Sequence, residues 1–109
     1  MTTRNLLSDL PGDADAEAFE RLAGTEAVRI ERIVSRGHRS PASGWYEQAQ
    51  AEWVALLQGE AMLVFEDGER LHLRVGDWVD IPARRRHRVE WTAADAASVW
   101  LAVHYPADD

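Results

Sequence analysis

Apolar and polar residues alternate along most of the chain from residue 26 onward, which is the pattern of β-strands with one buried face. Turn signals separate the alternating segments, and Asp67-Gly68 is the strongest hairpin signal among them. The alternation and the turns predict about eight short strands in a closed or sandwich-like all-β domain, and seven segments can be delimited. The segments cover residues 26–34, 53–57, 61–66, 70–75, 78–81, 87–91 and 99–105.

The first of these segments alternates between two sets of side chains. Val28, Ile30 and Val34 are expected on the buried face, opposite Arg29, Glu31 and Ser35. In the last segment, Val99, Leu101 and Val103 are expected in the core. Trp100, Ala102 and His104 would then lie on the other face, where His104 is an edge histidine first and a ligand second.

A different pattern precedes residue 26. Residues 1–12 end in Pro11-Gly12 and predict an extended arm, whereas residues 13–23 show helical spacing with Gly24 as the stop. We therefore expect an arm and one short helix in residues 1–25, and the barrel in residues 26–109 of a single domain. The apolar leucines of the arm need burial, which favours a homodimer.

The amino-acid composition argues against several classes of partner and of metal site. The chain has 109 residues, enough for one domain, and its formal charge of −7 argues against nucleic acid and membrane surfaces as partners. No apolar run approaches the roughly 20 residues of a membrane span, and residues 1–10 do not resemble a signal peptide, so we expect a cytoplasmic protein. Without cysteine, nitrogen and oxygen atoms must hold any metal.

The polar residues Tyr46, Gln48 and Glu52 stand directly before the apolar strand 53–57. Such a cluster at the mouth of a β core is the arrangement that small barrels use to hold a ligand or a metal. Glu52 is followed by six residues and then Gly59. Farther along the chain, Gly76 is followed by five residues and Pro82, and His87 comes five positions after that proline.

These spacings resemble the two motifs of the cupins, which are small double-sheet barrels of the double-stranded β-helix, jelly-roll-like type. In the first motif, Tyr46 and Gln48 occupy the positions of a His-x-His pair and Ser40 that of a glycine. In the second motif, Arg84 replaces a glycine and Trp91 an asparagine. The chain is also similar to a subgroup of small bacterial cupins with Tyr-x-Gln before Glu-Trp-Val.

The resemblance implies that Tyr46, Gln48, Glu52 and His87 point inward at one end of the barrel. Gln48, Glu52 and His87 are then the candidate ligands of a divalent Zn, Mn, Fe or Ni ion, with Tyr46 beside them and a small polar metabolite as ligand. If the chain is an enzyme, isomerase, lyase and oxygenase are the expected classes, because a metal or an acid–base pair in a closed pocket serves enolisation and C–H deprotonation. A glutamine in this set resembles phosphomannose-isomerase-type sites.

Three alternatives to a metal site involve the same four side chains. Without a metal, Glu52 and His87 could act as general base and acid while Tyr46 and Gln48 orient a substrate. The site could also bind or sense a small molecule without catalysis, or it could be a satisfied polar network in a structural dimer.

The run from Arg84 to Arg86 could attract a carboxylate or phosphate to the barrel mouth, or lie in a solvated loop.

Overall fold

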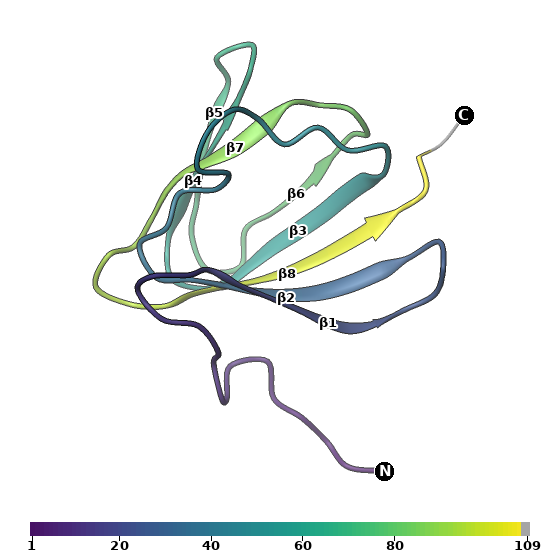
Figure 1. Cartoon of the computed structure of the whole chain (residues 1–109), viewed down its shortest axis with the longest axis vertical. Helices are drawn as coiled ribbons and strands as arrows, with labels where there is room; N and C mark the ends of the chain where they lie inside the picture. The colour runs from purple at the N-terminus through teal and green to yellow at the C-terminus, as the bar shows by residue number, and fades with distance from the viewer. Residues whose placement is uncertain (108–109) are drawn as a thin grey trace.

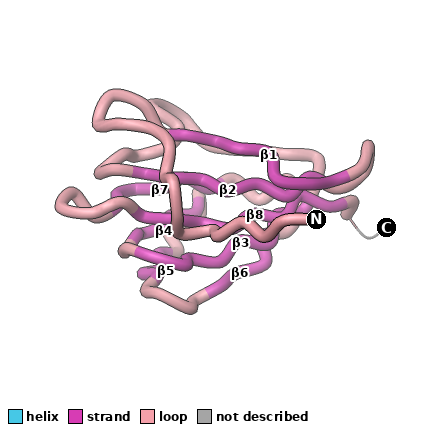
Figure 2. The backbone as a smooth tube through the Cα atoms, turned by 90° about the horizontal axis from the view of Figure 1, so that it is seen from below, coloured by secondary structure: helices cyan, strands magenta, loops and turns pink. Residues whose placement is uncertain are grey.

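The computed structural model describes residues 1–107, and every regular element among them is a β-strand. The chain forms two antiparallel sheets that face each other (Figures 1 and 2). The larger sheet has the order β1-β2-β8-β3-β6 and the smaller one the order β5-β4-β7. The strands are β1 (Ala18–Gly24), β2 (Arg29–Ser35), β3 (Ala51–Gln58), β4 (Ala61–Phe65), β5 (Arg70–Leu73), β6 (Trp78–Ile81), β7 (His87–Thr92) and β8 (Ser98–Tyr105).

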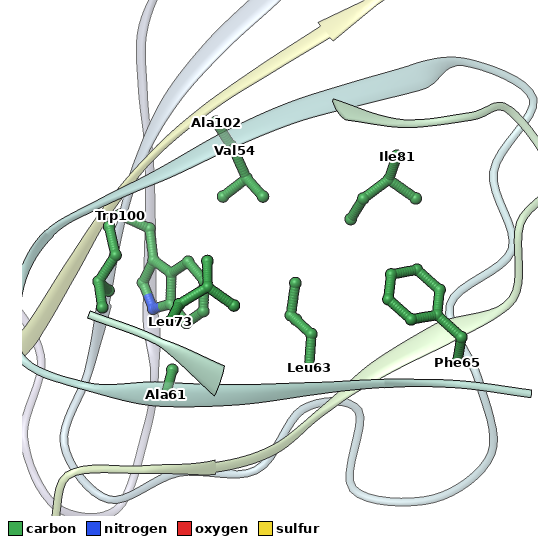
Figure 3. Packing of buried hydrophobic residues seen from close by; sticks show 9 residues of the cluster. Val54, Ala61, Leu63, Phe65, Leu73, Ile81, Trp100 and Ala102 are labelled. Carbon is green, nitrogen blue, oxygen red and sulfur yellow. The ribbon is translucent and has the colours of Figure 1, made fainter. Parts of the chain in front are cut away.

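The hydrophobic core lies between the two sheets (Figure 3). Inward-facing side chains of β3, β6 and β8 meet those of β4 and β5, as the alternation of each strand requires. The buried cluster consists of Val54, Leu56, Ala61, Leu63, Phe65, Leu73, Ile81, Trp100 and Ala102. The all-β jelly-roll-like fold predicted from the sequence is therefore confirmed.

The predicted helix at residues 13–23 is absent, and this prediction was wrong. Asp13 Oδ1 does accept the peptide N–H groups of Asp15 and Ala16, as a helix cap would, but the turn it closes does not propagate. Residues 18–24 instead form β1, which pairs with the otherwise open edge of β2. An isolated helix of this length is marginal in water, whereas the neighbouring strand offers a complete set of ladder hydrogen bonds.

Arg32 on β2 fastens the N-terminal arm to the outer face of the larger sheet. The residue is 8% exposed, and its guanidinium donates to the carbonyl oxygens of Leu6, Ser8 and Asp9 and to the carboxylate of Glu20. The arm thus covers part of this face. Within residues 1–107, no helix is long and apolar enough to cross a membrane.

Candidate functional site

A cavity of about 200 Å³ opens between the two sheets, next to the hydrophobic core. It is smaller than the pockets of several hundred Å³ that hold drug-sized ligands, so it suits a small metabolite. The four positions Tyr46, Gln48, Glu52 and His87, which the cupin resemblance implied would point inward, all line it. Its wall also includes Glu17, Phe19, Arg29, Glu31, Ser40, Trp100 and His104.

Strand register places a row of polar groups across the inner face of the larger sheet. His104 on β8 lies directly between Arg29 on β2 and Glu52 on β3, because it is the pairing partner of both. Side chains of paired residues in antiparallel strands share a face, so the three project together. Ile81 on β6 is paired with Glu52 and ends the row on its apolar side.

Glu52 lies between two imidazoles. Its Oε1 is 3.4 Å from Nε2 of His87 and its Oε2 is 3.7 Å from Nε2 of His104. The side chains of Glu52, His87 and His104 are 12%, 6% and 4% exposed. At this burial, charged groups interact more strongly with one another than they do on the surface.

The backbone of β7 and its preceding loop fixes the orientation of His87. Nδ1 of His87 lies 2.8 Å from the carbonyl oxygen of Arg85 and donates its proton there. The peptide groups of His87 and Tyr46 exchange two hydrogen bonds, which holds the Tyr46 segment against β7. Nε2 of a neutral His87 therefore presents a lone pair to Glu52 and the cavity.

Tyr46 is a neutral phenol at the cavity wall. Burial raises the pKa of Tyr46 above 10.0, and the nearby carboxylates of Glu17 and Glu52 add to this rise, while the hydrogen bond from Ser40 opposes it. The Tyr46 hydroxyl and Ser40 Oγ form that hydrogen bond. Ser40, which stands at a glycine position of the motif, is thus a partner that spacing alone did not reveal. A protonated phenol is a hydrogen-bonding group here rather than a phenolate ligand.

His104 faces inward, contrary to the orientation predicted for β8. Trp100, Ala102 and His104 are 3%, 0% and 3% exposed and face the core or cavity, whereas Leu101 and Val103 lie on the outer face. Alternation divides a strand into two faces but does not say which is inner. The aliphatic set was misassigned because the arm covers part of the outer face, which is therefore apolar as well.

The same inversion applies to β2. Arg29 and Glu31 line the cavity, although the sequence placed these two residues opposite the buried face of Val28, Ile30 and Val34. Of that predicted set, Val34 is buried, whereas Val28 and Ile30 are partly exposed. Glu31 Oε1 lies 3.1 Å from His104 Nε2, and Glu31 Oε2 lies 3.3 Å from Arg29 Nε. Glu31 and His104 are therefore site residues that the sequence pattern did not identify as such.

The three arginines at positions 84–86 make different contacts. Arg85 pairs with Asp67 and Glu69, and Arg86 pairs with Glu47 and Glu66. Those two guanidinium groups are thus engaged by carboxylates outside the cavity. None of the three arginines lines the cavity.

Arg84 has a backbone role instead. Its φ of 66° is the left-handed conformation that favours glycine, which the family motif has at this position. Its peptide N–H donates to the carbonyl oxygen of Gln48 at 2.7 Å. The loop before β7 is thereby joined to the segment that carries Gln48 and Tyr46.

Among residues 1–107, no three His, Asp or Glu side chains are arranged to hold a metal ion. The two oxygens of Glu52 face different imidazoles, and His104 lies closer to Glu31 than to Glu52. The predicted set of Gln48, Glu52 and His87 contains only two residues of these types, so it stays a prediction.

Comparison with known proteins identifies the fold family. The family model described as "Cupin domain" matches residues 33–104, and no curated protein matches the chain. A structure described as a "putative mannose-6-phosphate isomerase" from Ralstonia eutropha JMP134 is 41% identical, with a TM-score of 0.91 over 98% of this chain and 100% of that one.

Two more distant structures share the fold. A cupin superfamily protein from Desulfitobacterium hafniense DCB-2 is 18% identical, with a TM-score of 0.78 over 97% of this chain and 93% of that one. An RmlC-like cupin family protein with a double-stranded β-helix fold from Methanocaldococcus jannaschii is 24% identical, with a TM-score of 0.70 over 90% of this chain and 87% of that one. The chain therefore belongs to the cupin domain family.

Proposed function

We propose that this cupin binds a small polar metabolite in the cavity and transfers a proton on it, as an isomerase or lyase does, with Glu52 and His87 as the acid–base pair. One observation carries the proposal. A buried carboxylate faces imidazole nitrogens on both sides inside a cavity of metabolite size. Groups of this kind take up and release protons in general acid–base catalysis.

Each residue of the pair has a defined atom for the task. Glu52 presents its carboxylate oxygens to the cavity as the base. His87 accepts or donates at Nε2, because Nδ1 is committed to the carbonyl oxygen of Arg85. The neutral Tyr46 hydroxyl and the Gln48 side chain orient the bound molecule by hydrogen bonds.

The relative from Ralstonia eutropha supports an isomerase-type reaction. It is described as a "putative mannose-6-phosphate isomerase" and covers nearly the whole chain at 41% identity. Aldose–ketose isomerisation requires removal of a proton next to a carbonyl and its return to the neighbouring carbon. A carboxylate and an imidazole in one cavity are suited to that chemistry.

Solvent exchange tests the proposal. The full chain is incubated in D₂O with mannose and with mannose 6-phosphate, and deuterium at the carbon next to the carbonyl is followed by NMR. We expect incorporation by the wild type and a loss of about 10²- to 10⁴-fold in Glu52→Gln and His87→Gln. Glu60→Gln, on the His72 side of the smaller sheet, is the matched control and should keep the wild-type rate. Equal rates in wild type and Glu52→Gln would exclude Glu52 as the base. Tight binding without exchange would favour a sensing module.

A metal-dependent form of the same site is the second candidate. The observation that favours it is the lone pair of His87 Nε2, which faces Glu52 Oε1 with the other ring nitrogen held by a backbone carbonyl. Gln48, Glu52 and His87 would hold Zn, Mn, Fe or Ni after a small rearrangement. A bound ion would supply a Lewis acid that polarises a substrate carbonyl. Metal analysis of protein purified without chelator distinguishes the two forms, because a stoichiometric ion must be lost in both Glu52→Ala and His87→Ala.

The proposal also includes a cytoplasmic homodimer. The outer face of the larger sheet carries the partly exposed Ile30, Leu101 and Val103, and Trp78 at its edge is 62% exposed. Leu7, in the arm that covers part of this face, is 47% exposed. Apolar surface of this kind is typical of subunit contacts. Sedimentation should give a dimer for the wild type and a monomer for Val103→Arg, and a monomeric wild type at micromolar concentration would contradict the dimer.

A further inference from the structure

The cavity holds more negative than positive side chains. Glu17, Glu31 and Glu52 line it, and Arg29 is the one arginine among its lining residues in a chain without lysine. With the imidazoles left out of the count, three carboxylates against one guanidinium leave an excess of two formal negative charges. A cation that enters is attracted, whereas an anion loses its water and meets repulsion.

Arg29 does not offset the negative charge of the cavity by providing a binding site for an anion. Its Nε lies 3.3 Å from Oε2 of Glu31, so its charge is already opposed by a carboxylate of the same cavity. Its side chain is 43% exposed, which places much of it in water. A phosphate would therefore find no second cation in the wall to share its charge.

Glu52 lacks the hydrogen bonds that a buried carboxylate ordinarily accepts. None of the described residues donates one to its oxygens, and the two imidazole nitrogens lie 3.4 and 3.7 Å away. His87 gives its Nδ1 proton to the carbonyl oxygen of Arg85, and Nε2 of His104 is hydrogen-bonded to Glu31. The Glu52 oxygens thus have acceptor capacity left for a ligand, and among the described residues Nδ1 of His104 is buried without a hydrogen-bond partner.

Aromatic rings complete the cavity. Phe19, Tyr46 and Trp100 line it together with the carboxylates. The face of an aromatic ring attracts an ammonium group, and a desolvated setting strengthens the attraction. Carboxylates, ring faces and an unpaired acceptor all favour the same kind of ligand group, a positively charged N–H donor.

We infer that the cavity selects a small hydroxylated molecule bearing a protonated amine over its neutral and phosphorylated counterparts. This inference rests on the proposed binding of a small metabolite in the same cavity and names the charge class of that metabolite. The ammonium group would donate to Glu52 and be attracted by Glu31. Hydroxyl groups would reach Gln48, Tyr46 or His87 at the opposite wall.

A matched set of probes tests the inference. Glycerol, aminopropanediol and glycerol phosphate share one carbon skeleton and differ in a single group. NMR titration of the full chain measures the binding of each, with chelator present so that no divalent ion supplies the positive charge. We expect the amine to bind about tenfold more tightly than glycerol, and glycerol phosphate to bind more weakly than either.

Charge variants link the preference to the cavity. Glu31→Gln keeps a hydrogen-bonding group of the same shape and should reduce the preference for the amine about fivefold, whereas the control Glu60→Gln should leave it unchanged. Equal binding of all three probes, binding of none by folded protein, or tighter binding of the phosphate would overturn the inference. Failure of the acid–base proposal is distinct, because the amine would then bind as expected while mannosamine, an amino sugar added to the D₂O exchange test, showed no deuterium incorporation.

Discussion

Glu52 and His104 are direct partners across β3 and β8, with Oε2 of the carboxylate 3.7 Å from Nε2 of the imidazole. Because His87 approaches the other oxygen of Glu52 from β7, one carboxylate connects imidazoles carried by the two different sheets. His104 is in turn hydrogen-bonded to Glu31. The proposed acid–base pair is therefore part of a longer chain of titratable groups along the cavity wall.

The first prediction concerns His104. Gln at this position can still donate to Glu31 but cannot take up a proton, so we expect His104→Gln to reduce the deuterium exchange rate roughly 10²-fold with the fold intact. The exchange assay with a circular dichroism spectrum measures both properties. His38→Gln, which alters a half-buried loop histidine outside the cavity, should retain the full rate. A His104→Gln rate equal to the wild type would remove His104 from the proton path.

The second prediction concerns the turn glycine of the first motif. Gly59 has φ +93°, and a Cβ added there would lie 2.2 Å from Ser98 Oγ and 2.6 Å from Ser98 Cα. We expect Gly59→Ala to lower the free energy of unfolding by about 2–4 kcal/mol, because left-handed strain and a backbone clash add together. Gly76→Ala has the same φ with open space around it and should cost about 1–2 kcal/mol. Urea denaturation of both variants checks this, and equal losses would show that the Ser98 contact is unimportant.

The close approach of Ser98 explains why the first motif has a glycine at position 59, with six residues between it and Glu52. Gly59 and Pro82 both mark backbone constraints, a close approach in one case and the end of β6 in the other. Constraints of this kind depend on residue type at fixed separations. The double-sheet fold and the placement of Glu52 and His87 in one cavity could therefore be predicted from the amino-acid sequence alone.

What could not be predicted depends on contacts between distant segments. His104 and Glu31 were assigned to the wrong face because the outer face of the larger sheet is also apolar, and the arm that covers part of it is attached through Arg32. The segment that became β1 carries local helix signals, and only the free edge of β2 makes it a strand. Periodicity describes a strand by itself and contains no information about its neighbours.

The third prediction concerns Arg84, which keeps the left-handed conformation of the motif glycine that it replaces. At φ 66°, a residue with a Cβ lowers the stability of the folded protein by about 1–2 kcal/mol. Glycine removes this strain, but the greater conformational freedom of the unfolded chain cancels part of the gain. We expect Arg84→Gly to raise the free energy of unfolding by about 0.5–1 kcal/mol. Arg70→Gly, at an exposed position of β5, should instead destabilise the protein. Destabilisation by both substitutions in denaturant titrations would contradict this account.

The fourth prediction concerns the pH dependence of Tyr46. Burial raises the pKa of Tyr46 above 10.0, so the folded protein retains the phenolic proton where the unfolded chain loses it. The stabilising contribution is complete below pH 10.0 and is lost as the pH rises through the folded-state pKa.

At neutral pH, Tyr46→Phe should lower the free energy of unfolding by about 1 kcal/mol, because the hydrogen bond with Ser40 is removed. The difference between wild type and variant should then shrink as the pH increases past 10.0, since phenylalanine has no proton to lose. Thermal unfolding of both proteins across this pH range measures the difference, and a constant gap would show that Tyr46 titrates alike in the folded and unfolded states.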